Sequence, residues 1–126
     1  MSYNFDFLVL WPYWPQLLWG CWMTLWLAAV SVVSGFLVGL LTAIVRDSAF
    51  APLRWLAIGY VELIRNTPFL LQIFFIFFGL PSVGISLNPW PAAVLALSLN
   101  CGAFSSEIIR QGIAAIPRGQ LEAGRA

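Results

Sequence analysis

Residues 16–45, QLLWGCWMTLWLAAVSVVSGFLVGLLTAIV, decide the class of fold. They belong to a run between Asp6 and Arg46 that contains no charged residue. About 20 apolar residues are enough to cross the hydrocarbon core of a bilayer. The stretch therefore predicts a transmembrane helix. Because it is longer than one crossing needs, we expect it to be tilted or to extend beyond the lipid.

The composition of the whole chain also indicates a membrane protein. Of 126 residues, 61% are hydrophobic and 9% are charged, which is too few polar residues to cover a soluble domain of this size. The chain has no Lys and no His. A phosphate-binding P-loop needs Lys, and a zinc HExxH site or a Ser/His/Asp triad needs His. We therefore expect no enzyme activity, no metal site and no ATP-hydrolysing site in this chain.

A second run without charged residues lies between Arg65 and Glu107 and must hold two spans. It is interrupted by turn-forming residues, namely Pro81, Gly84, Asn88, Pro89 and Pro91. The apolar parts on either side are shorter than a crossing requires, so the spans must include the flanking charges. The sequence thus predicts an all-α, polytopic transmembrane protein. We expect a single domain over 1–126 with three spans at about 16–45, 58–80 and 92–111.

The basic residues indicate how these spans are oriented. Arginines occur in the 46–54 loop, at Arg65 and in the tail after Arg110, whereas the N-terminus and the 81–91 loop have none. Loops rich in basic residues stay on the cytoplasmic side of a membrane. We therefore expect the N-terminus outside and the C-terminus inside.

Small residues recur every four positions in the first span, at Ser31, Gly35, Gly39 and Ala43. This spacing places them on one helix face, where small side chains let another helix approach closely. Packing within the chain is the favoured interpretation, and self-dimerisation is the alternative.

Charged residues at the ends of the second and third predicted spans repeat one pattern, Glu62-Leu-Ile-Arg65 and Glu107-Ile-Ile-Arg110. Residues three apart share a helix face, so each Glu is predicted to neutralise the Arg that follows it. Two interpretations stay open. The pairs could lie at the inner headgroups, or they could line a polar pathway or gate.

Polar residues follow directly after Arg65, as Asn66-Thr67-Pro68, with Gln72 one turn later in a Phe-rich run. Proline disfavours helix at the preceding residue and removes a backbone donor, so a helix start or a kink is expected at Thr67. Broken helices at membrane depth expose backbone groups that coordinate substrates. A role in lining the path is therefore a second hypothesis beside a simple helix start.

The last twenty residues, EIIRQGIAAIPRGQLEAGRA (107–126), mix apolar and charged side chains. The mixture is too polar for a lipid core and too apolar for a solvated linker. Such a tail predicts a protein partner at the membrane surface.

Several of these motifs together resemble the permease subunits of bacterial ABC importers for polar amino acids, such as histidine, glutamine and arginine. The matching stretches run in order along nearly the whole chain: TLWLA (24–28) with Gly35 and Gly39, YVELIRNTP (60–68), QIFFI (72–76), FSSEIIRQGI (104–113) and IPRGQLEAGRA (116–126). The last two are the most specific. The resemblance implies the N-terminal part of a type I importer transmembrane domain.

In that family, the segment that matches the end of this chain is the cytoplasmic EAA coupling loop, which docks on the ATPase subunit. Residues 112–126 would be the start of this loop, with contacts implied at Gly119, Gln120, Leu121, Glu122, Ala123, Gly124 and Arg125. Gly124 stands where the family usually has Ala, at a cost of up to about 1 kcal/mol of helix propensity. The family continues with two further spans, so the resemblance implies a chain truncated after the EAA motif.

The resemblance also implies partners: an ABC ATPase subunit that binds ATP and Mg, a second permease chain in a homodimer or heterodimer, and a periplasmic or lipid-anchored solute-binding protein. The implied location is the bacterial inner membrane, and no nucleic acid is expected. Two alternatives of other classes stay open. One is a truncated membrane scaffold that does not transport, and the other is an ion-coupled carrier or channel subunit without an ATPase.

Overall fold

A computed structural model gives the structure of the chain and describes residues 7–117 and Gln120. Every regular element in this part is a helix, which confirms the all-α prediction. The elements are η1 (Phe7–Tyr13), α1 (Trp14–Arg46), α2 (Ala51–Asn66), α3 (Phe69–Phe74), η2 (Phe75–Gly79), η3 (Leu80–Val83) and α4 (Pro89–Ala114). The segment η2 is π-helical, and η1 and η3 are 3-10 helices.

Two straight helices are long and apolar enough to cross a bilayer, over Leu10–Arg46 and Pro89–Ala114. The expected span over 58–80 is not one straight helix. It is divided between Ala51–Asn66 and Phe69–Val83, and the chain bends by 112° between them. The break falls at Thr67, whose backbone is extended, with φ of −109° and ψ of 139°. Proline at the next position disfavours helical geometry there, so the local sequence explains the bend.

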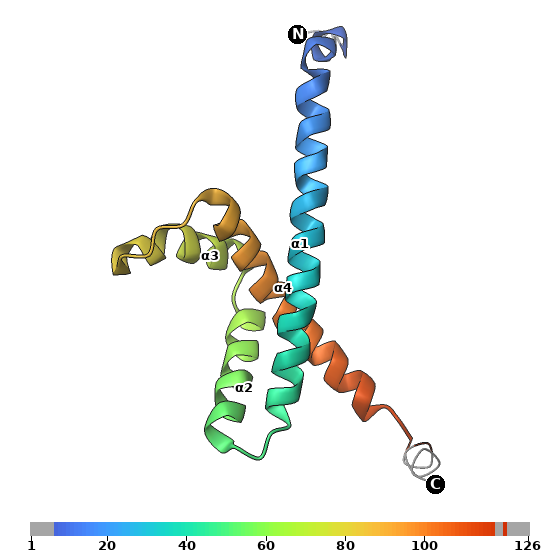
Figure 1. Ribbon diagram of the computed structural model, residues 1–126, viewed down its shortest axis with the longest axis vertical. Coiled ribbons are helices and arrows are strands. Elements are labelled where there is room, and N and C mark those ends of the chain that lie inside the picture. Colours follow the sequence, from blue (N-terminus) through green and yellow to red (C-terminus); the bar gives the residue numbers. More distant parts are fainter. Residues whose placement is uncertain (1–6, 118–119, 121–126) are drawn as a thin grey trace, which may run out of the picture.

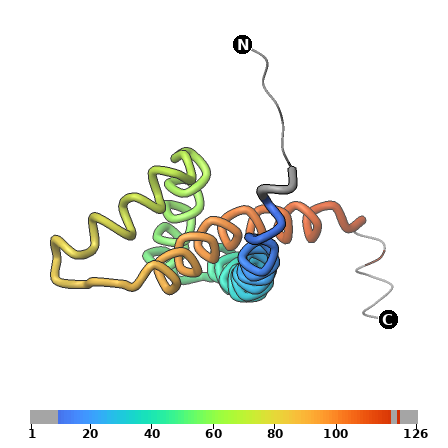
Figure 2. Tube along the Cα trace, turned by 90° about the horizontal axis from the view of Figure 1, so that it is seen from above, coloured from blue at the N-terminus to red at the C-terminus, as the bar shows by residue number. Residues whose placement is uncertain are grey.

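The helices form an open arrangement around the crossing of α1 and α4 (Figure 1). The C-terminal half of α1 has α2 beside it, and its N-terminal half extends beyond the other helices (Figure 1). From the end of α2 the chain turns into an arm made of α3, η2 and η3, which projects to one side in both views (Figures 1 and 2). The chain returns through α4.

The crossing of α1 and α4 is closely packed because both helices present small residues. A Cβ atom added to Gly35 would lie 2.6 Å from Cβ of Cys101, and one added to Gly39 would lie 2.6 Å from Cβ of Ser105. From the other helix, a Cβ on Gly102 would lie 2.7 Å from Cγ1 of Val38. All four small residues of the predicted face, Ser31, Gly35, Gly39 and Ala43, are buried. This face therefore packs within the chain, against α4.

Most large apolar side chains point outward, as lipid-facing side chains do. In α1 they extend over the whole length, from Trp14 to Ile44. Near the start of α4, Trp90 and three tryptophans of α1 line a hollow of about 400 Å³. Aromatic rings of this kind gather at membrane interfaces, so this end of the α1–α4 pair matches an interfacial belt.

The close crossing predicts that Gly39→Ala destabilises the chain. The added methyl group meets Cβ of Ser105 at 2.6 Å and the carbonyl oxygen of Gly102 at 2.9 Å, and overpacking of this kind costs roughly 1–3 kcal/mol. Gly59→Ala is the matched control, because its added methyl group meets nothing within 4 Å. We expect Gly59→Ala to leave the free energy of unfolding unchanged or to raise it by up to about 1 kcal/mol, because Ala has a higher helix propensity than Gly. Thermal unfolding of both variants in detergent measures the difference, and equal melting temperatures would contradict the packing.

Candidate functional site

Four of the residues predicted near the path belong to two groups in the structure, together with Arg46 and Asn100, whereas Glu62, Asn66 and Arg110 belong to neither group. The first, which we call the ionic cluster, consists of Arg46, Arg65 and Glu107 at the ends of α1 and α2 and near the end of α4. The second, the amide cluster, consists of Thr67, Gln72 and Asn100 at the bend between α2 and α3. Each group joins residues that are far apart in the sequence.

Glu107 is the centre of the ionic cluster. Its Oε2 accepts a hydrogen bond of 2.8 Å from Nη1 of Arg46 and lies 3.5 Å from Nη1 of Arg65. The guanidinium group of Arg65 also lies 5.7 Å from the ring centre of Phe104, one turn earlier on α4, at cation–π distance. One carboxylate thus links three helices.

Burial decides which of these contacts carries most energy. The Arg46 side chain is only 11% exposed. The Arg65 side chain is 41% exposed, so solvent screens its attraction to Glu107. Nε of Arg46 has no hydrogen-bond partner within the described ranges. The Arg46–Glu107 contact is therefore the dominant ion pair of the cluster.

The predicted pairs along single helices are not formed. Within the described residues, Glu62 is not within 4.0 Å of Arg65, and Glu107 is not within 4.0 Å of Arg110. Arg65 and Glu107 contact each other instead, and Nε of Arg110 lies 3.9 Å from Oδ1 of Asp47. Spacing within one helix brings charges to one face, but the packing of three helix ends brings opposite charges closer together.

The amide cluster surrounds the buried side chain of Gln72. Its Nε2 donates to the carbonyl oxygen of Ile64 at 2.8 Å, and to the carbonyl oxygen and Oγ1 of Thr67, both at 3.0 Å. Its Oε1 accepts from Nδ2 of Asn100 at 3.1 Å. Asn66 and Pro68 are exposed on either side of Thr67. Of the polar residues predicted at the bend, Thr67 and Gln72 are thus brought together.

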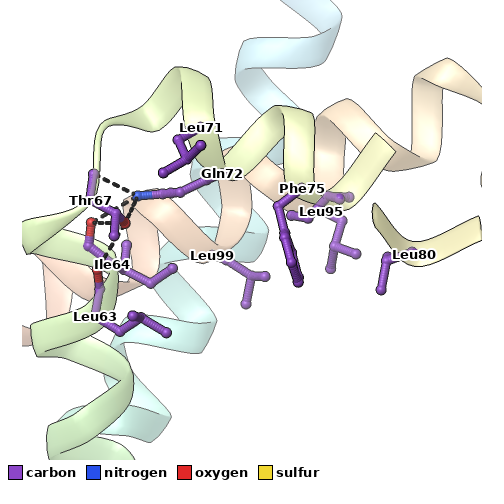
Figure 3. A pocket seen from close by; sticks show the side chains of 10 residues that line it. Leu63, Ile64, Thr67, Leu71, Gln72, Phe75, Leu80, Leu95 and Leu99 are labelled. Carbon is purple, nitrogen blue, oxygen red and sulfur yellow. Dashed lines mark hydrogen bonds between the residues drawn. The ribbon is translucent and has the colours of Figure 1, made fainter. Parts of the chain in front are cut away.

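An open, apolar groove of about 500 Å³ lies next to the amide cluster (Figure 3). Its walls come from the end of α2, from α3 with the start of η2, and from α4. Figure 3 shows the aliphatic side chains of Leu63, Leu95 and Leu99 and the ring of Phe75 around it, with Gln72 and Thr67 at one end. The bend between α2 and α3 therefore creates a concave surface that a straight span would lack.

Other polar contacts between helices were not predicted from the sequence. The hydroxyl group of Tyr60 donates to the carbonyl oxygen of Leu99 at 2.6 Å, and the hydroxyl groups of Ser34 and Ser98 are 2.6 Å apart. Asn100 was also missed. An amide inside an apolar span is rare, and that rarity was the available signal for Asn100.

Most of the implied coupling residues, Gly119 and those from Leu121 to Arg125, lie outside the described residues. Gln120 is described, is exposed, and donates its backbone N–H to the carbonyl oxygen of Pro117 at 3.0 Å. Among the described residues, no three His, Cys, Asp or Glu side chains come together as a metal site would require.

The ionic cluster predicts that Glu107→Gln destabilises the chain, because two arginines then lose their shared countercharge. The free energy of unfolding should fall by an intermediate amount, because the cluster is partly exposed. Exposed ion pairs contribute roughly 0.2–1 kcal/mol, and breaking a buried pair costs roughly 3–5 kcal/mol. Glu62→Gln is the control, because Glu62 is exposed and forms no ion pair with another described residue. Unfolding in detergent is the measurement, and an equal loss in both variants would contradict the cluster.

The chain is similar in sequence to several amino acid permeases. It is 46% identical over 112 residues to the L-cystine transport system permease protein of Bacillus subtilis (strain 168), covering 89% of this chain and 48% of that protein. It is 42% identical to the arginine transport system permease protein of the same organism, covering 95% of this chain and 55% of that protein. It is 36% identical to the glutamine transport system permease protein of Escherichia coli (strain K12), covering 98% of this chain and 57% of that protein.

A solved structure of an amino acid ABC transporter with histidines is similar to the chain at a TM-score of 0.91 and 40% identity, covering 98% of this chain and 57% of that one. The chain thus spans about half the length of the proteins it matches. The family model for binding-protein-dependent transport system inner membrane components matches residues 35–126, most of the chain. The chain therefore belongs to the family of binding-protein-dependent transport system inner membrane components.

Proposed function

We propose that the chain is part of the permease subunit of an ABC importer for polar amino acids. The observation that carries this proposal is the structural likeness to an amino acid ABC transporter, at a TM-score of 0.91 over 98% of the chain. The curated relatives named above have cystine, arginine and glutamine in their names, so the solute class we propose is polar amino acids.

The proposed setting is the bacterial inner membrane, with the N-terminus outside and the C-terminus inside. The positions of the arginines along the chain support this orientation, since the 46–54 loop and the segment from Arg110 onward contain arginines, whereas the 81–91 loop contains none. Near the starts of α1 and α4, tryptophans of α1 and Trp90 of α4 gather as an interfacial belt does.

A short stretch of α4 supports a role in transmitting movement. Residues 98–107 bond to each of the other main helices: Ser98 to α1, the Leu99 carbonyl to α2, Asn100 to α3, and Glu107 to both α1 and α2. A displacement at the end of α4, near the segment that resembles the coupling loop, would therefore reach the whole helix group.

The proposed partners are an ABC ATPase subunit, a second permease chain and a solute-binding protein. ATP and Mg would be bound by the ATPase subunit, and this chain would have no catalytic role. Residues 112–126 would begin the coupling loop, with Glu122 and Arg125 as contacts to the ATPase. Transport would follow alternating access, and Glu62, Arg65 and Glu107 would lie near the inner end of the path.

Uptake into proteoliposomes tests this function. Vesicles containing the complete permease subunit of which this chain is part, an ABC ATPase and a solute-binding protein should accumulate labelled arginine, glutamine or cystine only when ATP is supplied. Uptake that continues without ATP while an ion gradient is kept would indicate an ion-coupled carrier instead. Absence of uptake from the correctly inserted complete subunit in the presence of all partners would favour the membrane scaffold.

Charge reversal tests the proposed coupling segment. We expect Glu122→Lys to lower solute uptake per ATP hydrolysed by roughly tenfold, the factor that corresponds to about 1.4 kcal/mol of lost coupling. Asp47→Lys is the control, since it changes the charge equally at a side chain that is 67% exposed. Parallel measurements of hydrolysis and uptake give the ratio, and an unchanged ratio in Glu122→Lys would remove this residue from the coupling surface.

A further inference from the structure

The bend between α2 and α3 interrupts the backbone hydrogen bonds, and the nearest side chain replaces the lost bond only weakly: Oγ1 of Thr67 lies 3.4 Å from the carbonyl oxygen of Ile64 and 2.8 Å from that of Leu63. In a continuous helix, the N–H of residue 68 would donate to the carbonyl oxygen of Ile64, four residues earlier. Proline has no N–H, and Thr67 is extended, so the helical bond to this carbonyl is lost. In a membrane protein such a carbonyl has little water to turn to, so another donor must take the place of the missing N–H.

The side chain of Gln72 is that donor. Its Nε2 lies 2.8 Å from the carbonyl oxygen of Ile64, the group that loses its backbone donor at Pro68, and this contact is shorter than the 3.4 Å contact from Oγ1 of Thr67. The same nitrogen also donates to the carbonyl oxygen and to the hydroxyl oxygen of Thr67, which are the next acceptors along the bend (Figure 3). A primary amide nitrogen has two N–H groups, so these three acceptors occupy both.

The other end of the same amide contacts a different helix. Oε1 of Gln72 accepts from Nδ2 of Asn100, which belongs to α4. The carboxamide group therefore joins the end of α2 through its nitrogen and α4 through its oxygen, while its own backbone belongs to α3. Gln72 is only 8% exposed, so water is not a ready substitute for these partners.

We propose that Gln72 is a positioning residue that holds the α2–α3 bend by supplying the hydrogen-bond donor that Pro68 lacks, and that fixes α3 to α4 through Asn100. This role differs from a solute-binding role, because both N–H groups of the amide are used within the chain. The bend and the groove beside it depend on this side chain. The inference concerns the chain in lipid and does not require the proposed transport function.

A double-mutant cycle tests the link between Gln72 and Pro68. Gln72→Leu removes the donor and should alter the angle between α2 and α3. Pro68→Ala restores a backbone N–H at position 68 and lets the chain straighten, so that the carbonyl of Ile64 regains a helical partner. In the Pro68→Ala background, Gln72→Leu should therefore have much less effect than it has alone.

The angle is followed by the distance between spin labels on Leu56 of α2 and Phe78 of η2, both of which are exposed. The 126-residue chain would be labelled in lipid nanodiscs, with Cys21 and Cys101 replaced by alanine. We expect Gln72→Leu to shift or broaden the distance distribution, whereas Gln16→Leu, an identical change at an exposed site on α1, leaves it unchanged. The proposal would be overturned if the effects of Pro68→Ala and Gln72→Leu on the label distance simply add. It would also be overturned if Gln72→Leu leaves the distance distribution unchanged.

A second pair of variants keeps the test decisive if Gln72→Leu fails to fold. Gln72→Glu has nearly the same shape and retains an oxygen for Asn100, but it offers at most one donor to the three acceptors when protonated and none when ionised. Asn100→Ala keeps the donors of Gln72 and removes only the link to α4. We expect Gln72→Glu to disturb the label distance across the bend more than Asn100→Ala does, and the reverse order would contradict the assignment of the donor role.

Discussion

The close crossing of α1 and α4 sets where the polar side chains of the other helices can find partners. Two glycines of α1 and one of α4 leave no room for a Cβ atom, so the backbones approach within the reach of short side chains. This approach lets the hydroxyl groups of Ser34 and Ser98 meet at 2.6 Å. It also brings Arg46, at the end of α1, into contact with Glu107 on α4, although the two residues are far apart in the sequence.

The polar contacts follow a common rule set by the bilayer. Where lipid replaces water, a backbone or side-chain polar group needs a partner inside the protein. On α4, the consecutive residues Ser98, Leu99 and Asn100 supply such partners to α1, α2 and α3, Glu107 supplies them again to α1 and α2 about two turns later, and the groove lies beside this stretch (Figure 3). The same stretch therefore holds the helices together and places polar groups beside the concave surface. In the proposed importer, α4 would be the element that carries movement from the coupling loop to the other helices.

The sequence predicted a large part of this structure and failed where distant helices meet. Apolar run length indicated α1, the turn-forming residues that divide the second uncharged run indicated α4, and Pro68 indicated the break after α2, because these signals are local. The pairing of Glu107 with Arg46 was missed, since helix spacing favoured Arg110 and the order of helix packing was unknown. The importance of Gln72 was noticed, but its partners were not, because the carbonyl that needs it is eight residues away and Asn100 is 28 residues away.

The contacts of α4 with the ends of α1 and α2 should make these helix ends move as one body. A test is the distance between spin labels on Leu56 of α2 and Ile108 of α4, two exposed residues, in the complete permease subunit assembled with an ABC ATPase. We expect the same distance distribution without nucleotide and with ATP bound, while hydrolysis shows that the ATPase is engaged. A nucleotide-dependent shift in this distance would show that α2 and α4 separate, and it would contradict the movement of these helices as one body.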